Sequence, residues 1–234
     1  MKAIVCSKLG PPSDLEFIEL PDPVPSSDEV LIRVEACGIN FPDTLIIQGL
    51  YQFKPELPFS PGSDVAGVVE AVGDNVTTVK PGDEVVAMTG WGGFAEKITV
   101  SAKSCYPKPP GMDMVNAASF LMAYGTSYYA LKERANLQKG ETLVVLGASG
   151  GVGLTAVELG KLHGARVIAA ASSADKLAVC KEYGADEVIN YSEEDLKNRI
   201  KELTNGQGAD VIYDPVGGCL LYTSDAADDY TSVD

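Results

Sequence analysis

Residues 143–153 read LVVLGASGGVG, a continuously apolar run that ends in three glycines at intervals of three. A run of this kind, without polar alternation, is typical of a parallel strand that is buried on both faces. Gly147, Gly150 and Gly153 let the backbone turn sharply and approach a ligand closely. The amphipathic segment 152–163 predicts a helix directly after the turn. Its N-terminus offers free N–H groups and a partial positive charge, which favour a pyrophosphate.

A second apolar strand, 166–170, follows the predicted helix. The order strand, glycine turn, helix, strand is the context that a dinucleotide-binding motif requires. The alternative is that the glycines only form a tight strand–helix turn. We interpret the turn as a dinucleotide site. Its candidate cofactor-binding residues are Gly147, Ser149, Gly150, Gly151, Val152 and Gly153.

The end of the second strand indicates which dinucleotide is bound. NAD-binding units usually carry Asp or Glu there, which accepts hydrogen bonds from the ribose 2′-hydroxyl. Residues 170–176 read AASSADK, so no carboxylate ends the strand. The hydroxyls of Ser172 and Ser173 and the charge of Lys176 suit a 2′-phosphate instead, which favours NADPH over NADH. Alternatively, the serines cap the next helix and Lys176 is only solvated.

The chain has two parts of different character. Residues 1–120 hold short alternating segments between Gly and Pro, such as 30–36, 66–72 and 84–88, and they predict an irregular, mostly antiparallel β domain. Residues 121–218 alternate between helix and strand, which predicts a doubly wound parallel sheet that stops after its fourth strand. A single helix is expected over 114–133, and four strands are expected over 143–146, 166–170, 187–190 and 210–213.

Residues 219–234, CLLYTSDAADDYTSVD, depart from the preceding pattern. They resemble one reading frame of a transposase adapter used in preparing sequencing libraries. Our hypothesis is that the natural sequence ends near Gly218 and that the rest is an artefactual tail, against the alternative of a natural acidic tail. The chain would then be a fragment. With its fourth strand left at an edge it is expected to bind cofactor weakly or not at all and to be inactive itself, so its function is that of the parent protein.

Composition excludes several classes of protein. The formal net charge is −15, which disfavours nucleic acid and anionic membranes as partners. Five cysteines without a CxxC pair indicate reduced thiols in the cytoplasm and neither a disulfide framework nor a zinc lobe. The single histidine, His163, falls near the end of a predicted helix and is interpreted as a partner of the helix dipole. No apolar stretch reaches membrane-spanning length.

Several further motifs occur in a fixed order along residues 1–218. They are GINFPD (38–43), PFSPGSD (58–64), VKPGDEV (79–85), the glycine turn, GAD (184–186), INY (189–191) and DPVGG (214–218). With these motifs the chain resembles the zinc-free quinone oxidoreductases of the medium-chain dehydrogenase/reductase superfamily, which include the zeta-crystallins. The resemblance covers about two thirds of a family member. It lacks the last two sheet strands and the C-terminal segment that returns to the β domain.

The resemblance implies a GroES-like β domain joined to a Rossmann domain, with the active site in the cleft between them. Zinc-dependent relatives carry cysteine where this chain has Asn40, and a His-Glu pair where it has Ser63 and Asp64. Amide and hydroxyl groups are poor zinc ligands, so no metal is expected. Without a Lewis acid, alcohol oxidation lacks a means of stabilising an alkoxide, whereas an electron-poor quinone or enone needs less help.

The resemblance also implies roles for individual residues. Asn40 and Asp43 lie near the nicotinamide and substrate, and Tyr51 borders the substrate cleft, where it is a candidate proton donor. Thr126 contacts the cofactor. Lys176 and Tyr191 match positions that hold the 2′-phosphate. Each has a structural alternative: Asn40 as a loop residue that bonds its own backbone, Tyr51 as a packing residue, and Tyr191 as a cover for the sheet edge.

The predicted function of the parent protein is NADPH-dependent reduction of quinones or α,β-unsaturated carbonyl compounds. One alternative is an enoyl-thioester reductase, and another is a catalytically silent NADPH-binding protein of the crystallin type. A small-molecule acceptor, a cytoplasmic location and a homodimeric parent are expected, with no nucleic acid, membrane or metal involved.

Overall fold

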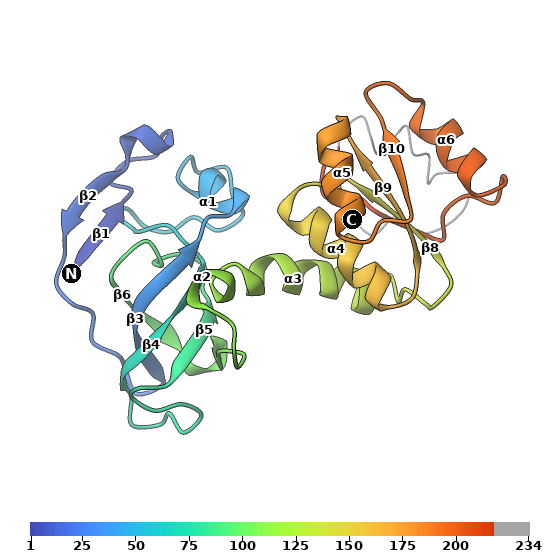
Figure 1. Cartoon of the computed structure of the whole chain (residues 1–234). Coiled ribbons are helices and arrows are strands. Elements are labelled where there is room, and N and C mark those ends of the chain that lie inside the picture. Colours follow the sequence, from blue (N-terminus) through green and yellow to red (C-terminus); the bar gives the residue numbers. More distant parts are fainter. Residues whose placement is uncertain (218–234) are drawn as a thin grey trace. The chain divides into compact units, whose positions relative to one another are not determined.

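The computed structural model describes residues 1–217, so the expected tail at 219–234 lies outside the described residues. The chain forms two compact units (Figure 1). The first runs Met1–Met122, and the second begins at Ala123. Helix α3 (Phe120–Tyr128) contains the boundary between them.

The first unit is built on a five-stranded sheet with the order β6-β3-β4-β5-β7, and every neighbouring pair is antiparallel. The prediction of an antiparallel β domain is confirmed. Gly67 lets the two longest strands approach, because a Cβ there would lie 2.1 Å from the carbonyl oxygen of Arg33. The strands of this unit are β1 (Lys2–Val5), β2 (Glu16–Glu19), β3 (Glu29–Gly38), β4 (Asp64–Val72), β5 (Glu84–Met88), β6 (Lys97–Ser101) and β7 (Cys105–Pro107).

The expected helix over 114–133 is wrong as a single element. It consists of α2 (Met114–Ala117), α3 and a π-helix (Tyr129–Arg134). In an unbroken helix the Met122 N–H would bond the Ala118 carbonyl. Here the Asp64 carboxylate accepts that N–H at 3.0 Å. The Ala118 carbonyl instead faces Gly38, where a Cβ would lie 2.5 Å from its oxygen. A side chain distant in sequence therefore replaces the helical acceptor.

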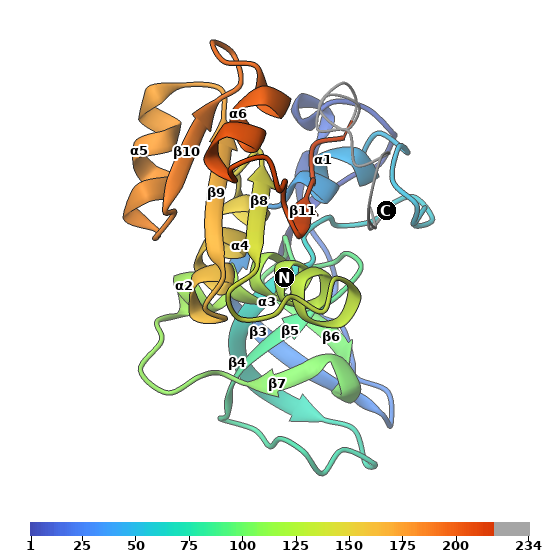
Figure 2. The same ribbon diagram turned by 90° about the vertical axis from the view of Figure 1, so that its right-hand side faces the viewer.

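The second unit holds a four-stranded parallel sheet with the order β10-β9-β8-β11. In chain order this is 3-2-1-4, as expected for the first four strands of a doubly wound sheet. Figure 2 shows the four strands side by side. The elements are β8 (Thr142–Leu146), α4 (Gly151–Leu162), β9 (Arg166–Ala171), α5 (Ala174–Glu182), β10 (Glu187–Asn190), α6 (Leu196–Leu203) and β11 (Val211–Tyr213).

Both faces of the central strand β8 are buried. Leu143 and Val145 pack in one core with residues of α4 and α5, whereas Val144 and Leu146 pack in another with residues of α6. All four side chains are fully buried. Because successive side chains point to opposite faces, a continuously apolar strand fills both cores at once.

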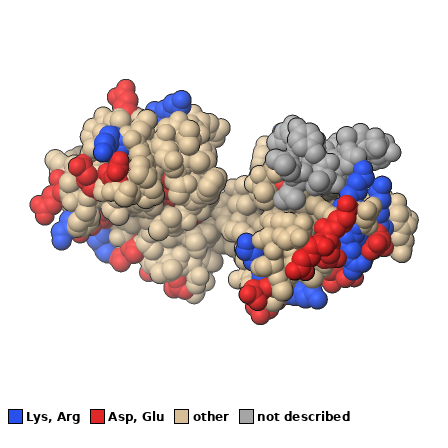
Figure 3. Space-filling model, turned by 90° about the horizontal axis from the view of Figure 1, so that it is seen from above, with Lys and Arg blue, Asp and Glu red and all other residues tan. Residues whose placement is uncertain are grey.

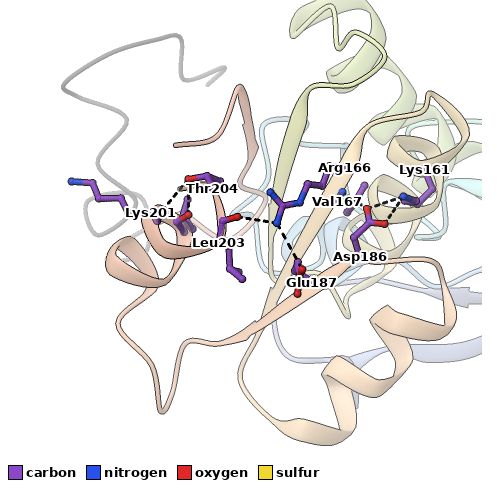
Figure 4. Close-up of polar contacts among 9 residues, drawn as sticks. Lys161, Arg166, Val167, Asp186, Glu187, Lys201, Leu203 and Thr204 are labelled. Carbon is purple, nitrogen blue, oxygen red and sulfur yellow. Dashed lines mark hydrogen bonds and ion pairs between the residues drawn. The ribbon is translucent and has the colours of Figure 1, made fainter. Parts of the chain in front are cut away.

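Polar contacts tie the amino ends of β9 and β10 to the neighbouring helices (Figure 4). Asp186 pairs with Lys161 of α4 at 2.7 Å and accepts the N–H of Val167 at 2.7 Å. The Arg166 guanidinium donates to the carbonyl of Leu203, the last residue of α6, at 2.9 Å. These contacts lie at the opposite end of the strands from the glycine turn, so they brace the sheet without occupying its carboxyl edge.

Acidic and basic side chains are interspersed over the face seen in Figure 3. In the first unit, Lys97 forms ion pairs with Asp22 at 2.8 Å and with Glu70 at 2.9 Å. Across residues 1–217, no helix combines the length and the apolar character that a membrane span requires.

Candidate functional site

The glycine turn joins β8 to α4 through very close backbone contacts. Gly147 has a φ of +57°, in the left-handed region that favours glycine. Ala148 donates its N–H to the Ala170 carbonyl at 3.0 Å, which ties the turn to β9. A Cβ at Gly153 would lie 2.5 Å from the Gly147 carbonyl oxygen, so only glycine lets the first turn of α4 pack so closely. The predicted strand–turn–helix is confirmed.

The N-terminus of α4 opens onto unfilled space. Gly150 occupies the N-cap position and Gly151 is the first helical residue, and both are exposed. A Cβ added at Gly151 would meet no atom of residues 1–217 within 4 Å. The first N–H groups of a helix have no partner within the helix, so an anion in front of Gly151 gains both hydrogen bonds and the helix dipole. The turn therefore has the geometry that a pyrophosphate needs.

The three candidate 2′-phosphate residues follow the carboxyl ends of β9 and β10. The Lys176 ammonium donates to the Ser172 hydroxyl at 3.0 Å. Tyr191 follows β10, and its N–H bonds the Ala171 carbonyl at 3.2 Å. The structure thus brings Ser172, Lys176 and Tyr191 to neighbouring strand ends, although their role as phosphate ligands stays a prediction. The Tyr191 ring also packs against the core beneath α6, and its alternative role as a cover for the sheet edge stays a prediction.

The alternative role of the two serines as helix caps is only partly observed, because one of them occupies the N-cap position without forming a capping hydrogen bond. Ser173 is the N-cap residue of α5, but its side chain makes no capping hydrogen bond. The backbone begins the helix there without using the hydroxyl. The Ser173 side chain is therefore not committed to the helix end.

Sequence reasoning missed Ser127, which anchors α3 to the glycine-turn helix. Its buried hydroxyl donates to the Val152 carbonyl at 2.7 Å and lies 2.8 Å from the Thr155 hydroxyl. Thr126, the predicted cofactor contact, precedes Ser127 on α3 and is exposed. A small polar residue inside a mainly apolar helical segment is the only signal that the sequence offered for Ser127.

In the first unit, Asp43 holds two loops together. Its carboxylate accepts the Asn40 N–H at 2.7 Å and the Gly62 N–H at 3.1 Å. Asn40 is the N-cap residue of α1 (Phe41–Ile46), and Asp43 is 5% exposed. Burial raises the pKa of Asp43 above its usual range, although both backbone bonds lower it. Asp43 therefore sets the geometry of the start of α1, and its contact with substrate stays a prediction.

Three polar atoms near the start of β4 are buried without a hydrogen-bond partner among the described residues: Asn40 Nδ2, Ser63 Oγ and Asp64 Oδ1. Gly38 stands opposite Asp64 in the sheet register, so the chain leaves β3 for α1 beside this strand end. Burial raises the pKa of Asp64 to about 6, although its bond from Met122 lowers it. Within residues 1–217, no group of three or more His, Cys, Asp or Glu side chains is arranged to hold a metal.

Tyr51 lies at the edge of a small apolar cluster. It packs against a core formed by Cys6, Ile46, Ile47 and Phe59, and its ring meets Phe53 edge to face at 5.7 Å between centroids. Tyr51 thus packs in the apolar cluster, as its alternative role as a packing residue predicts. A proton-donating role for its phenol stays a prediction.

The structure places four of the cysteines and the single histidine. Cys6, Cys37, Cys105 and Cys180 are free thiols, and Cys219 lies outside the described residues. His163 is the C-cap residue of α4, and its Nδ1 lies 2.9 Å from the Leu159 carbonyl oxygen. The ring therefore sits at the negative end of the helix dipole.

Comparison with known proteins identifies the class. Residues 26–110 match the alcohol dehydrogenase GroES-like domain, and residues 151–227 match the zinc-binding dehydrogenase family. Human quinone oxidoreductase is 38% identical over 223 residues, which cover 94% of this chain and 68% of the human protein. A quinone oxidoreductase-like protein 2 homolog from Nematostella vectensis is 41% identical over 219 residues, covering 93% and 60%.

Comparison with solved structures identifies the same class of protein. Escherichia coli quinone oxidoreductase, in complex with NADPH, is 35% identical with a TM-score of 0.91, covering 96% of this chain and 69% of that one. The CurK enoyl reductase is 30% identical with a TM-score of 0.87, covering 95% and 69%. The fold and the turn are those of a medium-chain dehydrogenase/reductase, and within that superfamily the chain belongs to the quinone oxidoreductase family. It spans 60% of the length of the Nematostella relative.

The close approach at Gly153 predicts a sharp contrast between two substitutions. Gly153→Ala pushes a methyl group into the Gly147 carbonyl and is expected to cost roughly 1–3 kcal/mol of stability, as overpacking does. Gly151→Ala adds a methyl group to open space and is expected to retain full stability while weakening anion binding in front of α4. Chemical denaturation of both variants measures the first effect. Equal stability of the two would contradict the proposed contact.

The buried Asp64 predicts a pH-dependent stability. Its pKa is raised in the folded state, so the folded chain keeps a proton that the unfolded chain loses between about pH 4 and pH 6. Stability therefore falls as the pH rises through that window, by about 3 kcal/mol for a shift of about two pKa units. Asp64→Asn mimics the neutral acid and keeps an oxygen for Met122. It is expected to be more stable than the unsubstituted chain at pH 7.5, with the difference vanishing near pH 4.

The exposed Asp74→Asn provides the control for a simple change of charge. Urea unfolding at several pH values measures both variants. A stability difference for Asp64→Asn that does not change with pH would show that the carboxyl does not titrate as described.

Proposed function

We propose that the whole protein is an NADPH-dependent reductase of quinones or α,β-unsaturated carbonyl compounds and that it transfers hydride without zinc. The glycine turn is the main support for this proposal, because the first turn of α4 is open to a pyrophosphate. Ser172 and Lys176 follow the carboxyl end of the neighbouring strand β9. The NADPH complex of the E. coli relative supports the same choice of cofactor. The activity is proposed for the whole protein, because the chain spans 60% of the length of the Nematostella relative.

The phosphate groups are held by different parts of the second unit. Backbone N–H groups from 149–153 bind the pyrophosphate at the start of α4. Lys176 pairs with the 2′-phosphate as a point charge, and Ser172 and Tyr191 donate hydroxyl hydrogen bonds to it. Thr126 contacts the cofactor from α3, which Ser127 holds against α4.

Zinc-independent reduction is supported by the donors at the start of β4. Zinc-dependent relatives carry cysteine and histidine at the positions of Asn40 and Ser63. The amide and the hydroxyl that this chain has there are poor zinc ligands. Their unpartnered atoms suit hydrogen bonding to a polar molecule better than they suit a metal.

Bound NADPH supplies the hydride. The residues of the first unit orient the acceptor and bear the charge that develops on its oxygen. In the proposed mechanism, Asn40 donates from its amide to the acceptor oxygen, Asp43 fixes the loop that carries Asn40, and Tyr51 donates a hydrogen bond or a proton from its phenol. An electron-poor acceptor needs no stronger electrophile. The parent is further proposed to act on a small molecule as a cytoplasmic homodimer, without nucleic acid or membrane partners.

A second candidate is reduction of an enoyl thioester. The likeness to the CurK enoyl reductase favours it. The two reactions share hydride transfer to an electron-poor double bond and differ in the group that carries the substrate, so the test must compare free and thioester-bound acceptors.

Lys176 tests the choice of cofactor. Lys176→Gln removes the charge that faces the 2′-phosphate and is expected to weaken NADPH binding about tenfold while leaving NADH binding unchanged. The exposed Lys181→Gln, on the same helix, is the matched control. Calorimetric titration measures both cofactors. An equal loss for NADPH and NADH would refute recognition of the 2′-phosphate by Lys176.

Turnover by the full-length parent tests the reaction. We expect oxidation of NADPH with 1,4-benzoquinone or a free enone, unchanged after treatment with a zinc chelator. Faster turnover of an enoyl thioester would favour the second candidate. Cofactor binding without turnover of any acceptor would leave a silent NADPH-binding protein, and loss of activity on chelation would overturn the zinc-free mechanism.

A further inference from the structure

Asp214 lies directly after β11 and closes a tight loop with one of its two carboxylate oxygens. Oδ1 accepts the N–H groups of Val216 and Gly217, each at 2.9 Å. Oδ2 is buried and has no hydrogen-bond partner in the described part of the chain. A buried acceptor without a partner costs about 1–3 kcal/mol, so a native structure normally supplies one. The loop thus holds Oδ2 of Asp214 in a fixed position, where it can accept a hydrogen bond from a ligand.

This loop lies against the glycine turn. A Cβ at Gly147 would stand 2.5 Å from Cγ2 of Val216, so the two loops are in contact at the carboxyl edge of the sheet. The Asp214 carboxylate is therefore close to any ligand that the turn binds.

The strand order determines which part of a dinucleotide comes near Asp214. β8 lies between β9 and β11, and neighbouring strands are about 4.8 Å apart. Ser172 and Lys176 lie beyond β9, on one side of the glycine turn. A dinucleotide crosses the carboxyl ends of such a sheet with its pyrophosphate at the turn. If its adenosine 2′-phosphate lies on the β9 side, its nicotinamide half extends toward β11.

The chemistry of a carboxylate limits which groups of the dinucleotide Asp214 can contact. A carboxylate only accepts hydrogen bonds and repels phosphate. The nicotinamide half offers donors, namely the two ribose hydroxyls and the carboxamide. The ribose is nearer to the pyrophosphate, and therefore nearer to the glycine turn that the Asp214 loop touches.

We propose that Asp214 positions the nicotinamide half of the cofactor, with Oδ2 accepting a hydrogen bond from a hydroxyl of the nicotinamide ribose. This inference rests on the proposed NADPH-dependent function. It assigns the two halves of the cofactor to opposite sides of β8: the adenosine half to the β9 side and the nicotinamide half to the β11 side.

Binding of two ligands to matched variants tests the inference. NADPH contains both halves, whereas adenosine 2′,5′-bisphosphate lacks the nicotinamide half. Asp214→Asn keeps an oxygen for the two loop N–H groups but replaces Oδ2 with a donor. Asp214→Ser keeps only a shorter oxygen. Asp210→Asn makes the same change at the other end of β11, where the carboxylate accepts the Thr142 N–H at 2.7 Å.

We expect both Asp214 variants to bind NADPH about tenfold more weakly, the loss expected for one hydrogen bond to a charged group. Their affinity for adenosine 2′,5′-bisphosphate should not change, which also shows that the variants are folded. Asp210→Asn should bind both ligands as the unsubstituted chain does. Calorimetric titrations with ligand at millimolar concentration measure all four proteins.

Equal losses for the two ligands would show that Asp214 acts only through the shape of the glycine turn, and unchanged NADPH affinity would show that Oδ2 meets no cofactor donor. Either result overturns the inference while the proposed function stands. Because the chain itself is expected to bind cofactor weakly, the same titrations are made with the full-length parent. A parent that bound neither ligand would refute the cofactor site along with the inference.

Discussion

The closeness of α4 to the end of β8 underlies the architecture of the second unit. It depends on a missing side chain, because any Cβ at Gly153 would meet the Gly147 carbonyl at 2.5 Å. With that contact made, α4 starts directly above the strand end, and the bond from Ala148 to Ala170 aligns the turn with β9. The same closeness points the helix N-terminus into open space at Gly151. Packing and ligand binding thus impose the same requirement on these few residues.

A second constraint joins distant segments in the first unit through carboxylates. Asp43 connects the start of α1 to Gly62, and Asp64 accepts the N–H of Met122, 58 residues later in the chain. Each carboxylate is buried, and each accepts backbone N–H groups that have no acceptor within a helix or strand. Burying two acids in one region costs free energy, which the raised pKa values of both groups reflect. The resulting framework holds Asn40 and Ser63, each with one polar atom that no group within residues 1–217 pairs.

Much of this structure follows from local patterns. The strand at 187–190 and the strand at 84–88 were predicted to the residue, because each is a short β-branched run with turn residues on both sides. The helix break near Ala118 was not foreseen, because the acceptor that replaces a helical carbonyl belongs to Asp64, 58 residues earlier. Ser127 was missed for the same reason: its partners on α4 are 25 and 28 residues away. Periodicity carries no information about such contacts.

The two buried faces of β8 also limit how the chain can change in length. One core receives Leu143 and Val145, and the other receives Val144 and Leu146. Inserting one residue early in the strand would send each side chain to the opposite core and would move the glycine turn by about 3.3 Å along the strand axis. Neither helix layer is shaped for the exchanged set, and the turn would lose its alignment with β9. Changes in length are therefore expected in surface loops such as 205–209, while the span from Thr142 to Gly153 stays constant.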